Sequence, residues 1–297
     1  MDDKRLLFVY NSHSGKGKIK SHMVDVLEIF SEAGYEVVTY PTKCKGDATR
    51  IIELKGKEFD LIVCSGGDGT LDESVEGMIT GNLDIPLGYI PAGSTNDYAR
   101  SLNIPTDMKK AAHIAVNGTQ RLVDIGLFND KHFVYVAAFG VFTDVSYETS
   151  QDIKNLFGHG AYVFEGVKSI SEGGLRPIPM TIIADDQLIK DTFAYGMICN
   201  SKSVGGYKSI GFMEAEPDDG LFEGVFIKFP EDPTALNAVL TSLFYGEPDP
   251  ELVYFVKASE FSLRTRIPEK YSLDGENGGI HSDVEIKVLK QKIKLMV

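Results

Sequence analysis

The sequence predicts an α/β domain followed by an antiparallel β domain, and two observations lead to this fold class. Up to about residue 118, apolar runs of strand length alternate with stretches of helical periodicity, as in βα units around a parallel sheet. Beyond this point, strand-like runs follow one another mostly without helices, which favours antiparallel pairing. Because 297 residues suffice for two ordinary domains, we expect a doubly wound α/β domain at residues 1–122 and a β domain at residues 123–297.

The composition is that of a soluble globular protein, with 43% hydrophobic and 25% charged residues. No apolar run approaches the roughly 20 residues of a membrane-spanning helix, and the amino-terminal residues lack the apolar core of a signal peptide. We therefore expect a cytoplasmic protein whose cysteines, Cys44, Cys64 and Cys199, are reduced. The net charge of −13 disfavours nucleic acid as a partner, and any contact with anionic lipid would need a local patch.

The first βα unit begins with residues 6–10, a continuous apolar run typical of a strand buried on both faces of a parallel sheet. Apolar residues then recur at helical spacing from Met23 to Ala33, and Gly34 is a suitable helix C-cap. The loop between them, residues 11–18, carries hydroxylated residues, glycines and two lysines where ligands bind in open α/β sheets. It lacks the spacing of a P-loop. Taken by itself, it is better explained as a solvated polar loop.

Three more strands complete the predicted parallel sheet, at residues 35–40, 59–64 and 85–90. Helices are expected at residues 48–55, from the glycines after residue 65 to about residue 80, and at residues 108–116. This order of strands and helices is that of a doubly wound domain.

The glycine-rich turn at residues 66–70, Gly-Gly-Asp-Gly-Thr, joins the third strand to a helix. Such a turn leaves backbone N–H groups facing one way at the positive end of a helix dipole, which suits a phosphate chain. Asp68 would repel bare phosphate, so its presence favours an intervening divalent cation, most simply Mg²⁺. The alternative is an ordinary strand-to-helix turn. Two further strand ends, with Asn11 and Ser14 and with Ser94 and Asp97, would lie at the same edge of the sheet.

The β domain is expected from eight strand-like runs, interrupted by helical periodicity at residues 163–170 and 236–243, whose apolar faces are more often core than lipid-binding surface. The runs are residues 121–128, 132–138, 180–184, 193–199, 221–229, 260–265, 270–273 and 284–289.

Two loops of this domain carry carboxylates. Residues 216–221 crowd acidic side chains around a turn, which is either a solvated loop or a cation site with main-chain carbonyl ligands; the spacing alone favours the solvated loop. The second loop contains Asp274-Gly275-Glu276, and Asp-Gly between apolar runs is first of all a hairpin signal. A glutamate at such a tip can also act as a general base, and the residues alone leave both interpretations open.

Four motifs together resemble the diacylglycerol kinase catalytic-domain family, most closely its soluble bacterial lipid kinases. They are Asn11-Ser12-His13-Ser14-Gly15, Gly66-Gly67-Asp68-Gly69-Thr70, Pro91-Ala92-Gly93-Ser94-Thr95-Asn96-Asp97 and Asp274-Gly275-Glu276, and in this order they cover almost the whole chain. The resemblance implies a nucleotide-binding α/β domain, a β-sandwich-like domain and an active cleft between them. It also implies that the last strand, residues 286–297, could return to the first domain.

The resemblance assigns roles to individual residues. Asp68 and Asp97 would organise the catalytic Mg²⁺, and Glu276 would be the catalytic base. A structural Mg²⁺ would bind the carbonyls of Glu216 and Leu221 and the side chain of Asp219, which reverses the preference for a solvated loop. The implied nucleotide contacts are Asn11, Ser12, Ser14, Gly15, Thr42, Gly66, Gly67, Asp68, Gly69, Thr70, Asp72 and Ser94.

Three positions depart from the family pattern, which has proline at Ser12, asparagine at Asp72 and threonine at Ser94. Ser94 keeps the hydroxyl group. Asp72 adds a negative charge near the phosphates, which puts the nucleotide contact at this position in doubt.

The function implied by the resemblance is Mg²⁺-dependent transfer of the γ-phosphoryl group of ATP to a lipid hydroxyl, with diacylglycerol as the first choice of acceptor. Sphingoid bases, ceramide and phosphatidylglycerol are alternatives, as is NAD, because Gly-Gly-Asp-Gly-Thr also occurs in NAD kinases. A nucleotide-binding regulator without catalysis is the alternative from another class. The enzyme would meet its lipid by transient contact with a membrane surface, and a homodimer is an assembly that it could form.

Overall fold

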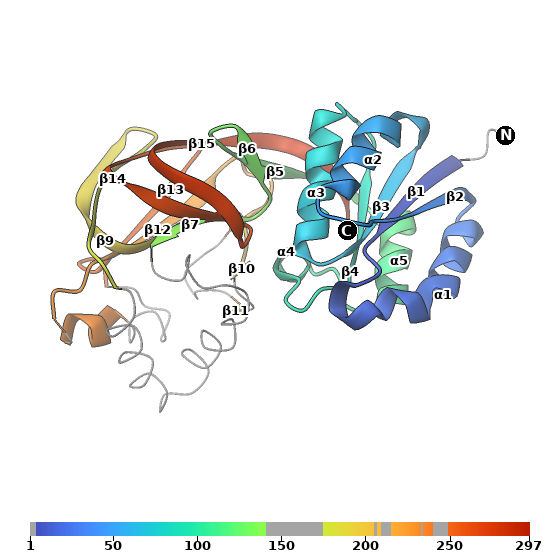
Figure 1. The fold of residues 1–297 in the computed structure, drawn as a ribbon, viewed down its shortest axis with the longest axis horizontal. Helices are drawn as coiled ribbons and strands as arrows, with labels where there is room; N and C mark the ends of the chain where they lie inside the picture. Colours follow the sequence, from blue (N-terminus) through green and yellow to red (C-terminus); the bar gives the residue numbers. More distant parts are fainter. Residues whose placement is uncertain (1–3, 141–174, 205–206, 209–214, 233, 240–248) are drawn as a thin grey trace. The chain divides into compact units, whose positions relative to one another are not determined.

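The computed structural model describes residues 4–140, 175–204, 207–208, 215–232, 234–239 and 249–297. The chain forms two compact units (Figure 1). Unit 1 comprises Met1–Ile125 and Lys290–Val297, and unit 2 comprises Gly126–Leu289. The predicted fold class, α/β followed by antiparallel β, is confirmed.

Unit 1 is built on a parallel sheet in the order β2-β1-β3-β4, with the end of β15 beside β4. Its strands are β1 (Lys4–Tyr10), β2 (Tyr35–Pro41), β3 (Leu61–Gly66) and β4 (Leu87–Pro91). Its helices are α1 (Lys18–Glu32), α2 (Asp47–Lys55), α3 (Asp68–Thr80), α4 (Asp97–Ser101) and α5 (Met108–Asn117), with 3₁₀ turns η1 (Ser14–Gly17) and η2 (Gly56–Glu58). Every residue of β3 and β4 is buried, as expected for strands covered on both faces.

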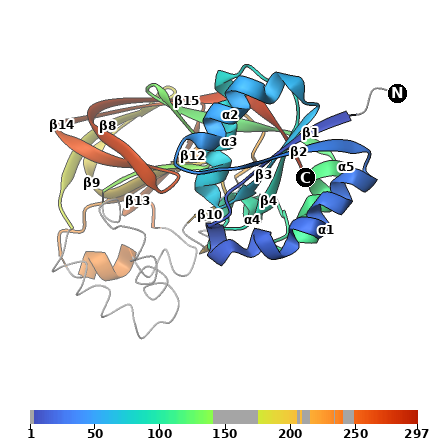
Figure 2. The same ribbon diagram turned by 45° about the vertical axis from the view of Figure 1, so that its right-hand side comes forward.

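Helices cover this sheet in two pairs, α2 with α3 and α1 with α5, which lie on opposite sides of the strands (Figure 2). All four strands of the sheet run the same way, so their carboxyl ends lie at one edge. The loops that follow β1, β3 and β4 therefore begin at a common edge of unit 1.

The strands of unit 2 pair antiparallel in the order β13-β12-β9-β7-β14-β15, and β8 pairs with both β9 and β14. The strands of unit 2 are β6 (Lys131–Phe133), β7 (Val136–Gly140), β8 (Ile178–Ala184), β9 (Gln187–Cys199), β10 (Ser203–Val204), β11 (Tyr207–Lys208), β12 (Phe222–Lys228), β13 (Val253–Ala258), β14 (Glu260–Leu273) and most of β15 (Glu276–Met296). Strands β10 and β11 pair with each other in a separate two-stranded sheet. Strand β5 (Gln120–Phe128) starts in unit 1 and pairs with β6 in unit 2.

Three strand predictions need correction. The run expected at residues 132–138 forms two strands, Lys131–Phe133 and Val136–Gly140. The runs at residues 260–265 and 270–273 form a single strand, β14, in which the register shifts between Arg264 and Glu269. This bulge lets β14 pair with β8 in its first half and with β7 in its second half. Strand β13 was not predicted, although its residues alternate between buried and less buried positions.

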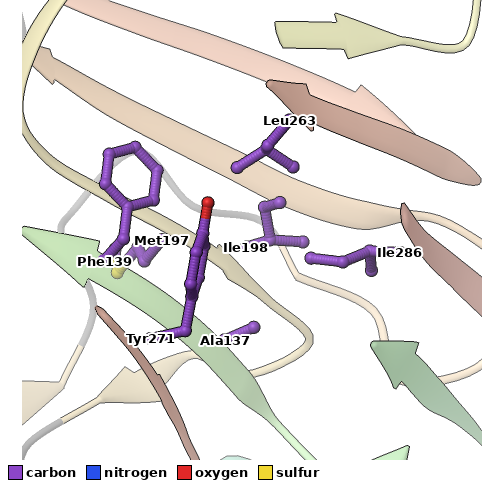
Figure 3. A pocket seen from close by; sticks show the side chains of 7 residues that line it. All are labelled: Ala137, Phe139, Met197, Ile198, Leu263, Tyr271 and Ile286. Carbon is purple, nitrogen blue, oxygen red and sulfur yellow. The ribbon is translucent and has the colours of Figure 1, made fainter. Parts of the chain in front are cut away.

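The core of unit 2 is rich in aromatic residues from facing strands, including Phe139, Phe193, Phe226 and Tyr271. A small apolar space between β7, β9, β14 and β15 is lined by Ala137, Phe139, Met197, Ile198, Leu263, Tyr271 and Ile286 (Figure 3). It is too narrow for a water molecule, so this part of the interior is packed core.

The expected helical insertion at residues 163–170 lies outside the described residues. The insertion expected at residues 236–243 overlaps a helix at residues 234–239, and its later residues lie outside the described ones. The Asp232 carboxylate accepts a hydrogen bond from the Ala235 N–H of this helix at 2.8 Å. Cys64 and Cys199 are buried free thiols and Cys44 is an exposed one. Within the described segments, no helix is long and apolar enough to cross a membrane.

Candidate functional site

The loops after β1, β3 and β4 meet in unit 1. The Gly67 N–H donates a hydrogen bond to Ser14 Oγ at 3.3 Å, which joins the first loop to the second. A Cβ on Gly15 would lie 1.9 Å from the Ala92 carbonyl oxygen, and a Cβ on Gly93 would lie 2.6 Å from the Gly67 Cα. Glycine is therefore required at both positions, because the backbones of the three loops approach each other too closely for a side chain.

Helix α3 starts directly at Asp68, and Gly67 stands at its N-cap position. Among the described residues no side chain caps this helix end. The Thr70 and Leu71 N–H groups both donate to the Gly67 carbonyl, at 3.0 and 3.2 Å. An uncapped helix N-terminus beside glycine-lined backbone is the local arrangement that binds phosphate groups in proteins.

The Asp68 carboxylate is buried in this region, with only 8% of the residue exposed. Its Oδ2 atom accepts a hydrogen bond from Thr95 Oγ1 at 3.4 Å, and the backbone of Asp97 and Tyr98 also donates to the carboxylate. Burial, and next the charge of Asp97, raise the pKa of Asp68 to about 6. Asp97, at the start of α4, is itself only 2% exposed.

These residues fit a divalent cation. The Asp68 Oδ1 atom is buried and accepts no hydrogen bond from the part of the chain that the structure describes. Its neighbour Asp97 carries a second buried carboxylate, so two like charges lie in a region of low polarity. A cation bound to carboxylate oxygens, the ligands that Mg²⁺ prefers, would compensate both charges.

The other implied nucleotide contacts all belong to unit 1. Thr70 packs against Gly66, on which a Cβ would lie 2.2 Å from Thr70 Oγ1. Thr42 is tied to β1, because both its N–H and its hydroxyl donate to the Tyr10 carbonyl, at 2.9 and 3.4 Å. Asn11 shapes the first loop, since its side-chain Oδ1 accepts from the His13 N–H at 2.9 Å. The remaining members are the half-buried Ser12, Gly69 and Asp72 and the exposed Ser94.

Asn96 fixes the third loop, and the sequence reasoning missed it. Its Oδ1 accepts from the Gly93 N–H at 2.8 Å and its Nδ2 donates to the Gly93 carbonyl at 3.0 Å. The residue has a φ of 51°, a conformation that asparagine adopts more readily than other non-glycine residues. An asparagine between a hydroxyl-rich loop and a helix start was the available signal.

The acidic turn of unit 2 brings Glu216, Asp219 and Leu221 together in one short segment. The Leu221 N–H donates to Asp219 Oδ1 at 2.9 Å, and Glu216 Oε1 lies 3.0 Å from Lys202 Nζ. No cluster of three or more acidic, histidine or cysteine side chains suited to a metal occurs in the described parts of the chain. The predicted Mg²⁺ at this turn, which relies on carbonyl ligands, stays a prediction.

Glu276 follows a tight hairpin turn in unit 2. Leu273 and Glu276 are paired across β14 and β15, which leaves Asp274 and Gly275 as the two turn residues. Both have positive φ, 50° and 83°, as a type I′ turn requires, so the hairpin signal in the sequence was correct. The Glu276 side chain is exposed. Asp68 and Asp97 belong to unit 1 and Glu276 belongs to unit 2.

Comparison with known proteins points to one family. Residues 5–128 match the model of the diacylglycerol kinase catalytic domain. The chain is 33% identical over 279 residues to a diacylglycerol kinase of Bacillus subtilis (strain 168). The aligned residues cover 93% of this chain and 91% of the relative. Its fold is similar to a crystal structure of a diacylglycerol kinase from Bacillus anthracis str. Sterne, with a TM-score of 0.77 and 20% identity over 100% of this chain and 97% of the other. Another structure from that organism gives a TM-score of 0.82 at 23% identity, covering 100% and 98% of the two chains.

Proposed function

The chain belongs to the diacylglycerol kinase family of ATP-dependent lipid kinases, and we propose that its acceptor is diacylglycerol and that its metal is Mg²⁺. The product would be phosphatidic acid. The names of the relatives support this acceptor, and 33% identity to the Bacillus subtilis diacylglycerol kinase extends over most of both chains.

One observation carries the metal-dependent part of the proposal. Asp68 and Asp97 place two buried carboxylates at the start of α3 and α4, where three glycine-containing loops meet. Two buried carboxylates repel each other, and a cation bound to them reduces this repulsion. The same cation can also bind the oxygens of an anionic ligand such as a phosphate chain. The uncapped N-terminus of α3 adds a positive field for the phosphate chain.

The chemistry follows from these groups. When bound, Mg²⁺ supplies positive charge that neutralises the β- and γ-phosphate oxygens during transfer. Asp68 and Asp97 would hold it, and the glycine turn at residues 66–70, at the start of α3, would cradle the phosphates. Glu276 would accept the proton of the acceptor hydroxyl. The hydroxyl oxygen of the acceptor then bonds to the γ-phosphorus, and ADP departs as the leaving group.

Two parts of the proposal concern the surroundings of the site. The acidic turn with Glu216, Asp219 and Leu221 would bind a structural Mg²⁺. Because the acceptor is a membrane lipid, the enzyme would contact the cytoplasmic membrane surface transiently, through a local patch that offsets its negative net charge of −13.

A phosphotransfer assay with several acceptors tests the proposal. Purified protein is given radiolabelled ATP and mixed micelles that contain diacylglycerol, sphingosine, ceramide or phosphatidylglycerol, with NAD in a parallel reaction. We expect labelled phosphatidic acid with Mg²⁺ and none with a chelator. Preferential labelling of another acceptor would overturn diacylglycerol as the substrate, and ATP binding without turnover on any acceptor would favour a non-catalytic regulator.

A further inference from the structure

The carboxylate of Asp274 is buried under the hairpin turn that precedes Glu276. Only 3% of Asp274 is exposed. Its Oδ1 atom accepts hydrogen bonds from the Tyr135 and Val136 N–H groups at 2.9 and 2.8 Å, and its Oδ2 atom accepts from the Val134 N–H at 2.5 Å. Three consecutive backbone donors therefore converge on one ionisable side chain, which is a strong type of hydrogen bond.

The same turn is also held through its backbone. The Asp274 N–H donates to the Val136 carbonyl at 2.8 Å, and Leu273 pairs with Ala137 where β14 runs beside β7. Residues 134–137, which form these hydrogen bonds with the turn, are themselves fixed in the sheet. The Asn200 N–H donates to the Tyr135 carbonyl at 2.9 Å. The turn is thus attached to the rigid start of β7 and not only to its own hairpin.

The backbone of Glu276 is closely constrained in this arrangement. It follows Asp274 by two residues, and its backbone pairs with Leu273. On its other side the register of β14 and β15 shifts, and the Asn277 side chain accepts from the Gly279 N–H at 3.0 Å. The position of the Glu276 backbone, from which its carboxylate extends, is therefore set mainly by where Asp274 holds the turn.

We propose that Asp274 is a positioning residue for the phosphoryl transfer, which acts by anchoring the turn that presents Glu276. This inference rests on the proposed role of Glu276 as the base. A general base must lie within hydrogen-bond distance of the acceptor hydroxyl, and a displacement of about 1 Å can lower the rate about 100-fold.

The variant D274N separates anchoring from turn formation. Asparagine adopts positive φ readily, and Asn-Gly is a preferred type I′ turn, so the hairpin itself is retained. Its Oδ1 can still accept from Tyr135 and Val136, whereas its NH₂ group would face the Val134 N–H, donor against donor. The change removes one buried anchor and leaves the chain conformation of the turn favourable.

Asp185 offers a matched control within unit 2. It also has positive φ, 48°, at a turn between two strands, and its carboxylate accepts from the Ser259 and Glu260 N–H groups at 3.2 and 3.0 Å. D185N therefore imitates the loss of charge and of backbone hydrogen bonding at a hairpin that carries none of the proposed site residues.

The test is a double-mutant cycle between D274N and E276Q, with kcat, the KM for ATP and circular dichroism measured for each protein. We expect D274N to lower kcat at least about 10-fold at unchanged KM for ATP, and D185N to leave kcat within about 2-fold of wild type. In the E276Q background, D274N should change kcat by less than about 2-fold, because a positioning residue has nothing left to position.

Each other outcome has a distinct meaning. Equal losses from D274N in both backgrounds would overturn the proposal, because Asp274 would then act on the fold and not through Glu276. Wild-type turnover by E276Q alone would instead refute the role of Glu276 in the proposed function. If D274N does not fold, D274E, which keeps both oxygens but moves them outward by one methylene group, takes its place in the cycle with the same two outcomes.

Discussion

At the scale of single residues, the chain keeps two kinds of buried polar group. Asp274 is stabilised by three backbone hydrogen bonds. The hydrogen bonds to Asp68 do not offset the cost of its burial. Burial and the charge of Asp97 together raise its pKa to about 6. A carboxylate that is costly to ionise in the folded protein indicates that its charge serves a ligand and not the fold.

The raised pKa of Asp68 predicts a pH dependence of stability without metal. Because the folded protein binds the proton more tightly than the unfolded chain, the contribution of Asp68 to the free energy of unfolding falls as the pH rises from about 4 to about 6. Above this range D68N should be more stable than wild type by about 1–3 kcal/mol. Chemical denaturation at pH 4 and pH 7.5 with a chelator measures this, and an equal effect of D68N at both pH values would contradict it.

Tyr271 gives a second prediction for a single residue. It is 2% exposed, its hydroxyl group has no hydrogen-bond partner among the described residues, and it lies beside the apolar space in the core of unit 2 (Figure 3). Removing an unsatisfied buried hydroxyl should be neutral or stabilising, so Y271F should raise the free energy of unfolding by up to about 1 kcal/mol.

Tyr89 is the control for this comparison. It is also buried, at 1% exposure, but its hydroxyl donates to the Gly66 carbonyl at 3.2 Å. Y89F should therefore lower the free energy of unfolding by about 1 kcal/mol. Urea denaturation of Y271F, Y89F and wild type measures both effects. If Y271F lost as much as Y89F, the Tyr271 hydroxyl would have a partner after all.

At the scale of elements, the parts of the fold that the sequence predicted are those where local pattern and burial agree. Residues 6–9 of β1 and residues 61–64 of β3 are apolar and buried because helices cover both faces of the sheet, and the Asp274-Gly275 turn has the residues that its backbone requires. The division of β14 between two partners could not be read locally, since it depends on a bulge and on strands far along the chain. For the same reason, the anchor beneath Asp274 was not predicted. The Asn96 contacts are local, between residues 93 and 96, and their sequence signal was overlooked.

The acidic turn is an element whose proposed metal can be tested apart from activity. In the D68N background, where the nucleotide site is impaired, Mg²⁺ should raise the melting temperature, with about 1.4 kcal/mol gained at about 10 times its Kd. D219N should abolish this gain while its Oδ1 still accepts from the Leu221 N–H. D218N, a change to the neighbouring acid, should keep the gain. Equal stabilisation of all three proteins by Mg²⁺ would refute the site.

At the scale of the whole molecule, the chain passes between the two units twice, at Ile125 and Gly126 within β5 and at Leu289 and Lys290 within β15. The carboxyl-terminal residues complete unit 1. Thr119 and Val297 exchange backbone hydrogen bonds at 2.8 and 2.9 Å, and Leu295 pairs with Leu87 of β4. Unit 2 is therefore an insertion between the two parts of unit 1.

This organisation predicts that the last residues of β15 stabilise unit 1. Leu295 is 1% exposed, so L295A should lower the free energy of unfolding by about 2–5 kcal/mol. The exposed neighbour Lys292 provides the control, because K292A removes no buried surface and should change stability by less than about 0.5 kcal/mol. A loss below about 1 kcal/mol for L295A in urea denaturation would contradict the assignment of this segment to the core of unit 1.

The central claim is that a phosphate and metal site in unit 1 works with a base supplied by unit 2, and the E276Q variant tests it most directly. Turnover of diacylglycerol and the Kd for Mg²⁺–ATP are measured side by side. The claim predicts that kcat falls about 10²- to 10⁴-fold while the Kd for the nucleotide is unchanged. Turnover close to that of the wild type would contradict it and would remove Glu276 from the mechanism.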